Sequence, residues 1–500
     1  MACRKAFFAN DMSIVRQIKE TISRTSQRAL GLDGIRFQLE VALERLEKLD
    51  TMHASLSAVA NQIGAISAEV DVLRARLEAI ETKNRVTFSS DAPGPSQASE
   101  NDHSAAPGPN QAETEVNGST PEGTTLLVTH AELCGRHGTG ALLLKLLRNE
   151  PSLTVFYSHD FFKIHDTEAP AFHIVHSGRL FQNGAKLVRS LLTDRKIRRI
   201  LCVPFYKDDV QTALTAQACT GAPLALYIMD DQNIHVHEIP DDMLGRLIDR
   251  ANICFAISPA LCAAYEQKYQ RRFWLAPPTA DPDLFVPPDY NFTPNTPTRG
   301  LVVGNVWSSQ ILSRFRETVR LSGLQIDWCG NAGKPFVELD LVELSKEGIF
   351  LKSHLPEPSL IELARTADYA VIPGGTLDGT DTHEWLARAS LPSRMVYLMS
   401  TANLPLIVMG HFQTAAAQFV INLGLGTVCD YSADHFQKAV REVSDGTTSA
   451  RIRARARSLS PAFSTRELSN WLWESMDKGK AVDERFEALI PRDNVLPSVA

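Results

Sequence analysis

From Thr124 onwards, short apolar runs alternate with helical segments, and the alternation occurs in two successive blocks. The first block contains the runs LTVFY, FHIVH, RILCVP, LALYIM and NICFAIS, separated by helical stretches such as DVQTALTAQAC and DDMLGRLID. After a Pro-rich break at 276–300, the second block contains GLVVGNVW, LQIDWCG, DYAVIP, LPLIVMG and GLGTVCDY. Alternation of this kind is typical of parallel sheets covered by helices on both faces. The sequence therefore predicts an α/β chain with two Rossmann-like domains, 124–290 and 291–480, a tail at 481–500, and a ligand cleft between the domains.

Residues 1–83 have a helical pattern, and their second helix carries a regular apolar seam. The seam positions are Leu49, Met52, Leu56, Val59, Ile63, Ile66, Val70, Leu73, Leu77 and Ile80. A repeat of 3.5 residues is the signature of a coiled coil, so we expect a homo-oligomer. The alternative is a helical hairpin in which residues 12–29 pack against the seam of the same chain.

Residues 84–123 link these helices to the first α/β domain. The segment is rich in Pro, Ser, Gly, Ala and acidic residues and contains almost no large apolar side chain. Such a composition cannot bury enough surface to offset the entropy of ordering, which predicts a flexible tether.

Composition excludes several functional classes. The net charge of −7 and the pI near 6.1 do not favour nucleic-acid binding. There is no run of about 18 apolar residues that would predict a transmembrane helix, and no secretory signal. The eight cysteines are scattered without a CxxC pair, so we expect free thiols, no structural zinc and a cytoplasmic location. The basic cluster ARIRARARS at 450–458 predicts the solvated face of a helix.

A glycine-rich loop follows the first predicted strand, in TTLLVTHAELCGRHGTGALLLKLLRN at 124–149. Backbone amides at the start of a helix can meet an anion or another polar ligand. Glycine also permits a tight strand-to-helix turn without any ligand. The loop by itself leaves both interpretations open.

The segment LYIMDDQNIHVHE places Asp230 and Asp231 just after a predicted strand, with His235 nearby. Open α/β sheets bind ligands at this edge, so the two carboxylates are candidates for a general base or for binding a hydroxyl group. The alternative is that an aspartate here only caps the loop or the next helix.

Three further segments resemble the two-domain GT-B glycosyltransferases, and in particular their family 4 type. They are AISPALCAAYEQKYQRRFWLAPPTADPDLF, ELARTADYAVIPGG and LPSRMVYLMSTANLPLIVMG, and the resemblance extends over about 124–480. It implies a nucleotide-diphosphate sugar as donor substrate, no cofactor and no bound metal. It also places the glycine loop at the cleft, where Gly138 and Gly140 would let the backbone approach donor or acceptor closely.

The resemblance also implies which residues bind the substrates. The expected donor-binding residues are Gly304, Asn305, Ser308, Gly374, Gly375, Ser393 and Arg394, with the Arg394 guanidinium on the phosphates. From their positions after a predicted strand and in the glycine loop, the expected catalytic residues are Asp230, Asp231 and His137; the expected cleft residues are Gly138, Gly140, His235 and Glu384. For Arg394 the alternative is a surface ion pair, and for His137 it is an ordinary polar loop residue.

The sequence departs from the family pattern in two respects. Family 4 enzymes usually carry two glutamates eight positions apart, and the second falls about where this chain has Tyr397 or Leu398. Glu384 has the wrong spacing to replace it. The usual basic residues after the first strand of the second domain are also missing, unless Arg314 or Arg316 reaches the site. Whether transfer would retain or invert configuration stays open.

These patterns favour a glycosyltransferase acting on a glycan, lipid or protein acceptor. The alternative from another class is a non-catalytic GT-B module that binds a sugar nucleotide or glycan within an oligomeric interaction protein. A sugar-nucleotide epimerase on the same fold is a third hypothesis.

Overall fold

The computed structural model describes residues 123–176, 184–306, 308–330, 339–352, 355–381 and 384–491. All of them belong to one compact unit, Glu115–Ala500. The predicted coiled coil, the linker up to residue 122 and the last nine residues lie outside the described residues.

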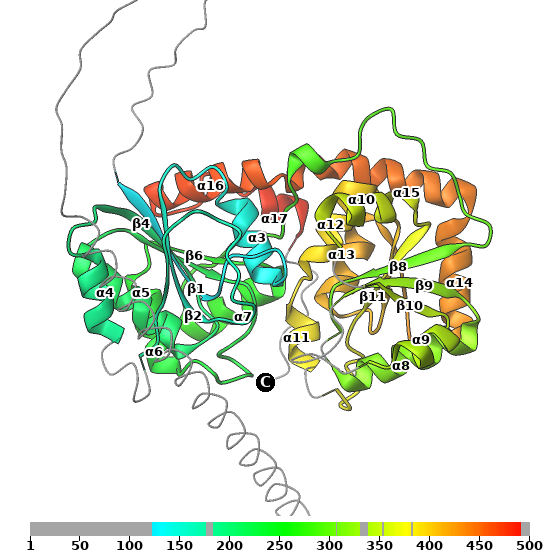
Figure 1. The fold of residues 1–500 in the computed structure, drawn as a ribbon, viewed down its shortest axis with the longest axis horizontal. Helices are drawn as coiled ribbons and strands as arrows, with labels where there is room; N and C mark the ends of the chain where they lie inside the picture. Colours follow the sequence, from blue (N-terminus) through cyan, green and yellow to red (C-terminus); the bar gives the residue numbers. More distant parts are fainter. Residues whose placement is uncertain are drawn as a thin grey trace, which may run out of the picture. The chain divides into compact units, whose positions relative to one another are not determined.

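The first block of apolar runs forms a parallel sheet of seven strands in the described residues (Figure 1). In chain order the strands are β1 (Thr124–Ala131), β2 (Leu153–His159), β3 (Ala171–His173), β4 (Ile197–Val203), β5 (Leu224–Ile228), β6 (Ile253–Ala256) and β7 (Trp274–Leu275). Their order across the sheet is β3-β2-β1-β4-β5-β6-β7. The connecting helices are α3 (Gly138–Leu146), α4 (Gly184–Leu192), α5 (Lys207–Thr220), α6 (Asp241–Arg250) and α7 (Pro259–Tyr269).

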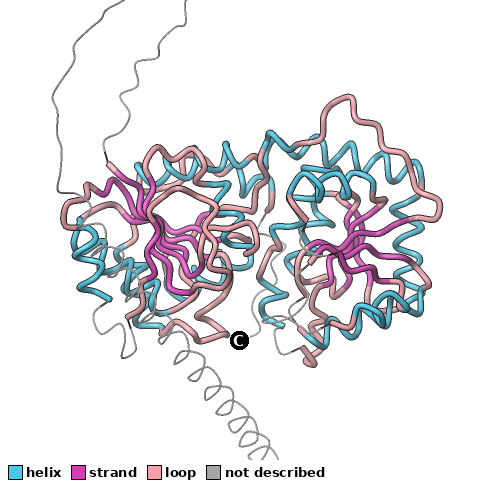
Figure 2. Tube along the Cα trace, viewed as in Figure 1, coloured by secondary structure: helices cyan, strands magenta, loops and turns pink. Residues whose placement is uncertain are grey.

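The described residues of the second block form a parallel sheet of six strands with the equivalent order, β10-β9-β8-β11-β12-β13. The strands are β8 (Arg299–Val303), β9 (Gln325–Cys329), β10 (Ile349–Lys352), β11 (Tyr369–Pro373), β12 (Leu406–Met409) and β13 (Gly426–Cys429). The helices are α8 (Ser309–Ser322), α9 (Leu341–Lys346), α10 (Glu357–Thr366), α11 (Glu384–Ala389), α12 (Ser393–Ala402), α13 (Ala415–Leu423), α14 (Ala433–Ser444) and α15 (Gly446–Leu459). Figure 2 shows the strands of each sheet gathered between layers of helices. The predicted pair of Rossmann-like sheets is confirmed.

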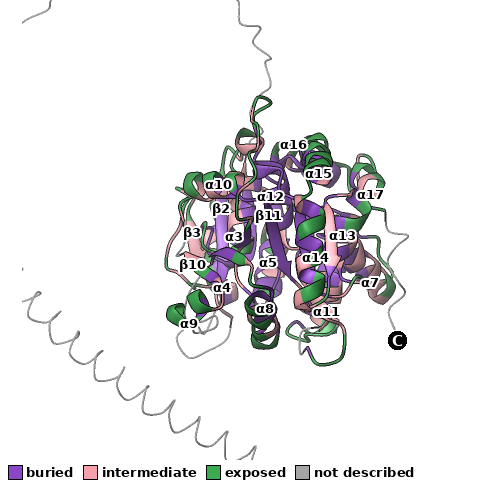
Figure 3. Cartoon of the chain, turned by 90° about the vertical axis from the view of Figure 1, so that its right-hand side faces the viewer, coloured by how far each residue is buried: buried purple, intermediate pink, exposed green. Residues whose placement is uncertain are grey.

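The strands form the core of both halves because they are apolar on both faces. β5 and β11 are buried along their whole length, and Figure 3 shows the strands in the interior with exposed residues on the outer faces of the helices. Local signals define the helix ends: Ser308 caps the start of α8, and Gly323 ends it in the left-handed conformation.

The last helices return to the first sheet. α16 (Thr465–Lys478) packs against α3, and α17 (Arg485–Leu489) packs against β7. The indole of Trp471 lies among the rings of Phe255 and Phe486, and the Arg199 guanidinium lies 3.7 Å from the ring centre of Trp473. The end of the described chain is therefore built into the first half of the molecule.

The basic cluster on α15 is only partly solvated, which corrects the sequence prediction. Arg453 is 9 % exposed, donates to the main-chain oxygens of Ala367 and Asp368, and lies over the ring of Phe292. Its charge fixes loops of the second half and is not presented to solvent.

None of the described helices combines the length and apolar content that crossing a membrane requires.

Candidate functional site

Each sheet has one point at which its strand order reverses, between β1 and β4 in the first sheet and between β8 and β11 in the second. Open α/β sheets bind ligands in the crevice outside the carboxyl ends of the strands at such a point. We call these the first crevice and the second crevice.

Aromatic and imidazole rings fill the first crevice. The ring of His130, at the end of β1, lies 3.7 Å from that of Phe205, which follows β4. His137, in the glycine loop, contacts His130 edge-on and stacks on Phe161 with the ring centres 5.4 Å apart. Phe161 also stacks on His159, with the ring centres 5.8 Å apart. The first crevice is therefore lined by rings.

The histidines of this ring cluster are uncharged near neutral pH. Burial lowers the pKa of His130 well below its usual value, helped by the neighbouring His137. Burial also lowers the pKa of His137, against the opposing effect of Glu132. In the described part of the chain, the Nδ1 atoms of both rings lack a hydrogen-bond partner. A neutral imidazole at the crevice can accept a proton or a hydrogen bond.

The glycine loop is a tight turn in the structure. A Cβ at Gly140 would lie 2.6 Å from the main-chain oxygen of Glu132, so only glycine lets α3 approach the end of β1 so closely. Gly138 has open space where a side chain would be, and the Gly135 amide donates to Asp166 at 2.8 Å. Glu132 is fully buried and accepts hydrogen bonds from the amides of Phe161 and Phe162.

Asp230 and Asp231 have different environments. Asp231 is fully buried and accepts hydrogen bonds from four groups: the amides of Asn233, Ile234 and His235, and the hydroxyl of Tyr265. These contacts hold the loop after β5, as in the capping alternative.

Asp230 instead faces the second half of the molecule. Its Oδ1 accepts a 2.6 Å hydrogen bond from the Ser390 hydroxyl, and burial raises its pKa to about 6. Asp230 therefore joins a segment that follows β5 to one that follows α11.

The α11 region provides two more contacts between the halves. The ring of His235 lies 3.9 Å from that of Trp385, and the hydroxyl of Ser258 donates to the main-chain oxygen of Ala389. Glu384, at the start of α11, is paired with Arg388 at 3.2 Å. Of the predicted cleft residues, Glu384 is thus the first residue of α11, and His235 contacts Trp385 of the same helix.

The second crevice contains Arg394 and the predicted glycine-rich backbone. The Nη1 of Arg394 donates to the main-chain oxygens of Val303 and Asn305, at 3.1 and 2.9 Å. Gly304 has a φ of +86°, and a Cβ on it would lie 3.1 Å from this nitrogen. The Arg394 Nε is buried without a hydrogen-bond partner among the described residues, and burial lowers the Arg394 pKa to about 10. The structure thus brings Gly304, Asn305 and Arg394 together, and Arg394 is not in a surface ion pair.

Gly374 and Gly375 follow β11 on the other wall of the second crevice. A Cβ at Gly375 would lie 2.3 Å from the Cβ of Ala387, so the glycine lets α11 lie close to the strand end. The Gly374 oxygen accepts a hydrogen bond from the Tyr431 hydroxyl at 2.7 Å.

The two serines among the predicted donor-binding residues belong to helix starts. Ser308 uses its hydroxyl to cap α8 and is 5 % exposed. Ser393 is the first residue of α12, directly before Arg394.

A polar cavity of about 510 Å³ lies at the carboxyl edge of the second sheet. Its lining includes Arg314, Thr376, Asp378, Gly410, His411, Phe412, Asp430, Tyr431 and Ser432. Arg314 donates to Asp378 and Thr380, so it reaches this edge, whereas Arg316 pairs with Glu347 elsewhere. Sequence reasoning named Arg314 only conditionally, because a helix period does not show which loop a long side chain meets.

At the position where family 4 enzymes carry the second glutamate, Leu398 is fully buried and Tyr397 lies under the Lys145 ammonium, 4.9 Å from the ring centre. Lys145 in turn pairs with Glu357 across the two halves. No group of three or more His, Cys, Asp or Glu suited to a metal ion occurs in the described ranges.

No protein-family model and no curated protein matches the chain. Solved structures do match it. Anabaena HepE in complex with UDP-glucose aligns with a TM-score of 0.52 at 12 % sequence identity, over 71 % of this chain and 99 % of that chain. HepE in complex with UDP and glucose aligns with a TM-score of 0.51 at 14 % identity over the same shares. Together with the two parallel sheets, this likeness shows that the described part of the chain has the GT-B glycosyltransferase fold.

Proposed function

We propose that the protein is a glycosyltransferase that transfers a hexose from a nucleotide-diphosphate sugar to an acceptor hydroxyl. The observation that carries the proposal is the second crevice, where a buried guanidinium edge meets a glycine backbone at the reversal point of a GT-B fold. The ligands in the HepE structures, UDP-glucose, UDP and glucose, support a uridine nucleotide as the first donor to test.

In this proposal Arg394 binds the diphosphate. The Nη1 hydrogen bonds to two main-chain oxygens fix the guanidinium plane. Arg394 is half-buried, so the accessible part of the guanidinium can donate to a phosphate oxygen. When the bond between the sugar and the phosphate breaks, the departing diphosphate gains negative charge. A cation already held in place stabilises that charge without reorganisation.

The acceptor side is assigned to Asp230 and His137. Asp230 has a pKa of about 6 and is exposed enough to be reached, and His137 is a neutral imidazole at the first crevice. Either group can take the proton that the acceptor hydroxyl loses. Asp231 is assigned to loop support, because four hydrogen bonds already occupy its carboxylate.

The alternative function is a sugar-nucleotide-binding module without transfer activity. It is favoured by the absence of an acidic side chain at Tyr397 and Leu398, where the resembling family carries a glutamate. The two functions differ in turnover, not in nucleotide binding.

Isothermal titration of the full chain with a panel of nucleotide sugars, followed by a hydrolysis assay on every binder, tests the proposal. We expect micromolar binding of at least one donor and slow hydrolysis that a suitable acceptor accelerates. Binding without hydrolysis, and without transfer to any of a panel of glycan, lipid and protein acceptors, would support the module instead.

We further propose that the apolar seam at 49–80 makes the protein a homo-oligomer. Light scattering on the full chain and on a chain that begins at Gly123 tests this. An oligomer that becomes a folded monomer on truncation is the expected result, and a monomeric full chain would refute it.

A further inference from the structure

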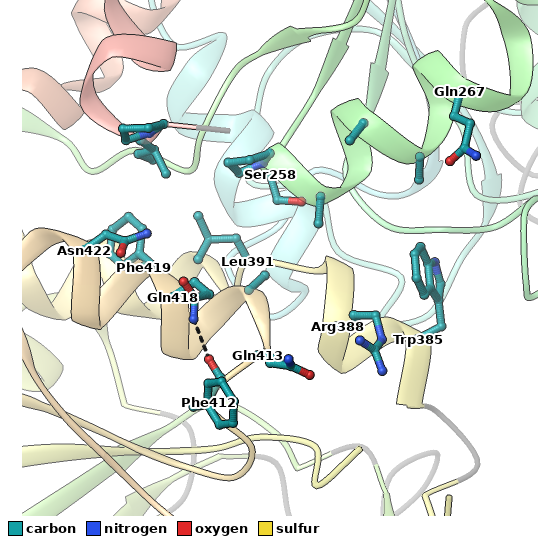
Figure 4. A pocket seen from close by; sticks show the side chains of 17 residues that line it. Ser258, Gln267, Trp385, Arg388, Leu391, Phe412, Gln413, Gln418, Phe419 and Asn422 are labelled. Atoms are coloured by element: carbon teal, nitrogen blue, oxygen red, sulfur yellow. Dashed lines mark hydrogen bonds between the residues drawn. The ribbon is translucent and has the colours of Figure 1, made fainter. Parts of the chain in front are cut away.

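An apolar groove lies between α7 on one side and α11 and α13 on the other (Figure 4). We call it the α7–α13 groove. Its cavity measures about 180 Å³. The lining is mainly apolar or small: Pro259, Ala260, Ala263, Ala264, Trp385, Leu391, Phe412, Ala415, Phe419, Ile490 and Pro491, with Ser258, Gln267, Arg388, Gln413, Gln418 and Asn422 between them.

The α7–α13 groove lies where the two halves of the molecule contact each other. The hydrogen bond from the Ser258 hydroxyl to the Ala389 oxygen ties the start of α7 to the end of α11. Along the groove α7 presents alanines, which leave the space unfilled, and the last described residues close one side.

Phe412 connects this groove to the polar cavity of the second sheet. It lines both cavities and is 55 % exposed, which is unusual for a phenylalanine in a folded chain. Its ring also packs against that of His411, which lines the polar cavity. A molecule in the α7–α13 groove and a molecule in the polar cavity would therefore both contact Phe412.

The charge of the lining is positive. Arg388 is the charged residue among the lining residues, and none of them is acidic. In Figure 4 Arg388 lies at the end of the groove near Trp385 and Gln413. Its partner Glu384 is not part of the lining, and both side chains of that pair are 30 % exposed. A ligand with an anionic head beside an apolar chain complements this surface.

We propose that the α7–α13 groove binds the apolar chain of the acceptor, and that this acceptor is an alkyl or isoprenoid lipid whose phosphate lies near Arg388 and whose accepting hydroxyl is on a sugar carried by that phosphate. The inference rests on the proposed glycosyltransferase function and selects the lipid from among glycan, lipid and protein acceptors. An apolar cavity of about 150 Å³ holds one benzene ring, so this groove holds a short segment of such a chain.

Titration of the full chain with butyl, hexyl, octyl and decyl phosphate, each below its micellar concentration, tests the proposal. Each added methylene should tighten binding by up to about fourfold until the groove is full, after which the affinity should level off. Affinity that does not depend on chain length would overturn the proposal.

Variants at Ala264 locate the site. Ala264→Phe fills the groove and should weaken octyl phosphate binding at least tenfold, with Ala264→Leu intermediate and Ala264→Ser, which keeps the space open, close to wild type. Circular dichroism and thermal unfolding of the same variants show that they are folded. Unchanged octyl phosphate binding in a folded Ala264→Phe protein would place the lipid elsewhere and refute the assignment.

The head group is tested at Arg388. Arg388→Gln should weaken octyl phosphate several-fold and leave octyl glucoside unaffected. An octyl ammonium salt that binds wild type as tightly as octyl phosphate would contradict the anionic head. These titrations contain no nucleotide, so the protein can bind octyl phosphate even if it binds no nucleotide sugar. It can equally bind a nucleotide sugar and no octyl phosphate. The lipid proposal and the glycosyltransferase proposal can therefore be refuted independently.

Discussion

At the carboxyl edge of the first sheet the buried charged groups are carboxylates, whereas the second crevice contains the half-buried guanidinium of Arg394 as well as the buried carboxylate of Asp381. Glu132, Asp209 and Asp231 are each at most 1 % exposed and accept hydrogen bonds from main-chain amides. Arg394 donates to main-chain oxygens instead. Main-chain groups thus satisfy the three carboxylates of the first edge and the Arg394 guanidinium of the second crevice.

The two crevices also differ in the groups that line them. Rings of His130 and Phe205 occupy the first, while glycine backbone borders the second at Gly304 and Gly374. The same strand order thus yields one surface suited to rings and hydroxyls and one suited to an anion. This difference is why we assign the donor to the second sheet and the acceptor chemistry to the first.

The strongest test of the first edge is removal of the Asp231 carboxylate. Asp231→Ala leaves three amides and the Tyr265 hydroxyl without their acceptor, which should lower the free energy of unfolding by roughly 3–5 kcal/mol. Urea denaturation measures it. The exposed Asp242, paired with Arg246 on α6, is the control, and Asp242→Ala should cost less than about 1 kcal/mol. Equal effects of the two variants would show that the first edge does not depend on its buried carboxylates.

The pH dependence of stability tests the same edge. Burial raises the Asp209 pKa from 3.8 to about 6. Between these values the folded state holds a proton that the unfolded state has lost. The stabilisation of the folded state by the protonated Asp209 is therefore fully present below about pH 4 and is lost as the pH rises through 6. It amounts to at most about 3 kcal/mol of the free energy of unfolding. Wild type should lose this stability relative to Asp209→Asn when both are titrated from pH 4 to 7. Parallel curves would mean that Asp209 ionises normally.

On the second edge, Arg394→Ala should weaken the binding of a nucleoside diphosphate by about 1.5–3 kcal/mol, as expected for a charge-assisted contact. Isothermal titration measures the affinity for the nucleoside diphosphate. The control variant is Arg320→Ala, which removes an exposed cation from α8. Unchanged affinity in Arg394→Ala would reduce the residue to a loop support and remove the contrast between the two edges.

Substitutions of two glycines in the glycine loop test whether this loop is a tight turn or a ligand-binding loop. Gly140→Ala forces a Cβ against the Glu132 oxygen and should cost about 1–3 kcal/mol of stability. Gly138→Ala places a methyl group in open space at the start of α3 and should be neutral or slightly stabilising. Thermal unfolding measures both. A neutral Gly140→Ala would mean that the close approach of α3 to β1 is not needed.

Much of the fold was predictable because local sequence patterns indicate its strands and helix ends. Strands buried on both faces, such as β5 and β11, are continuous apolar runs, and a helix start such as Ser308 carries its own capping signal. β10 was not predicted, because an edge strand with an exposed Phe350 lacks a continuous buried run. The return of α16 to the first sheet depends on contacts between distant segments, which a local pattern does not contain.

The candidate site was predictable only in part, for the same reason. The strand ends could be located, and Gly304 and Arg394 do meet. The pairing of Asp230 with Ser390 joins residues 160 positions apart, and the sequence gives no sign of it. The contact between His235 and Trp385 is equally non-local.

Hydrogen–deuterium exchange of the full chain, with and without saturating UDP-glucose, tests whether the donor binds the second crevice. We expect slower exchange of the amides at 304–306 and 374–376 and little change at 130–137. Slower exchange confined to 130–137 and the first crevice would contradict this expectation.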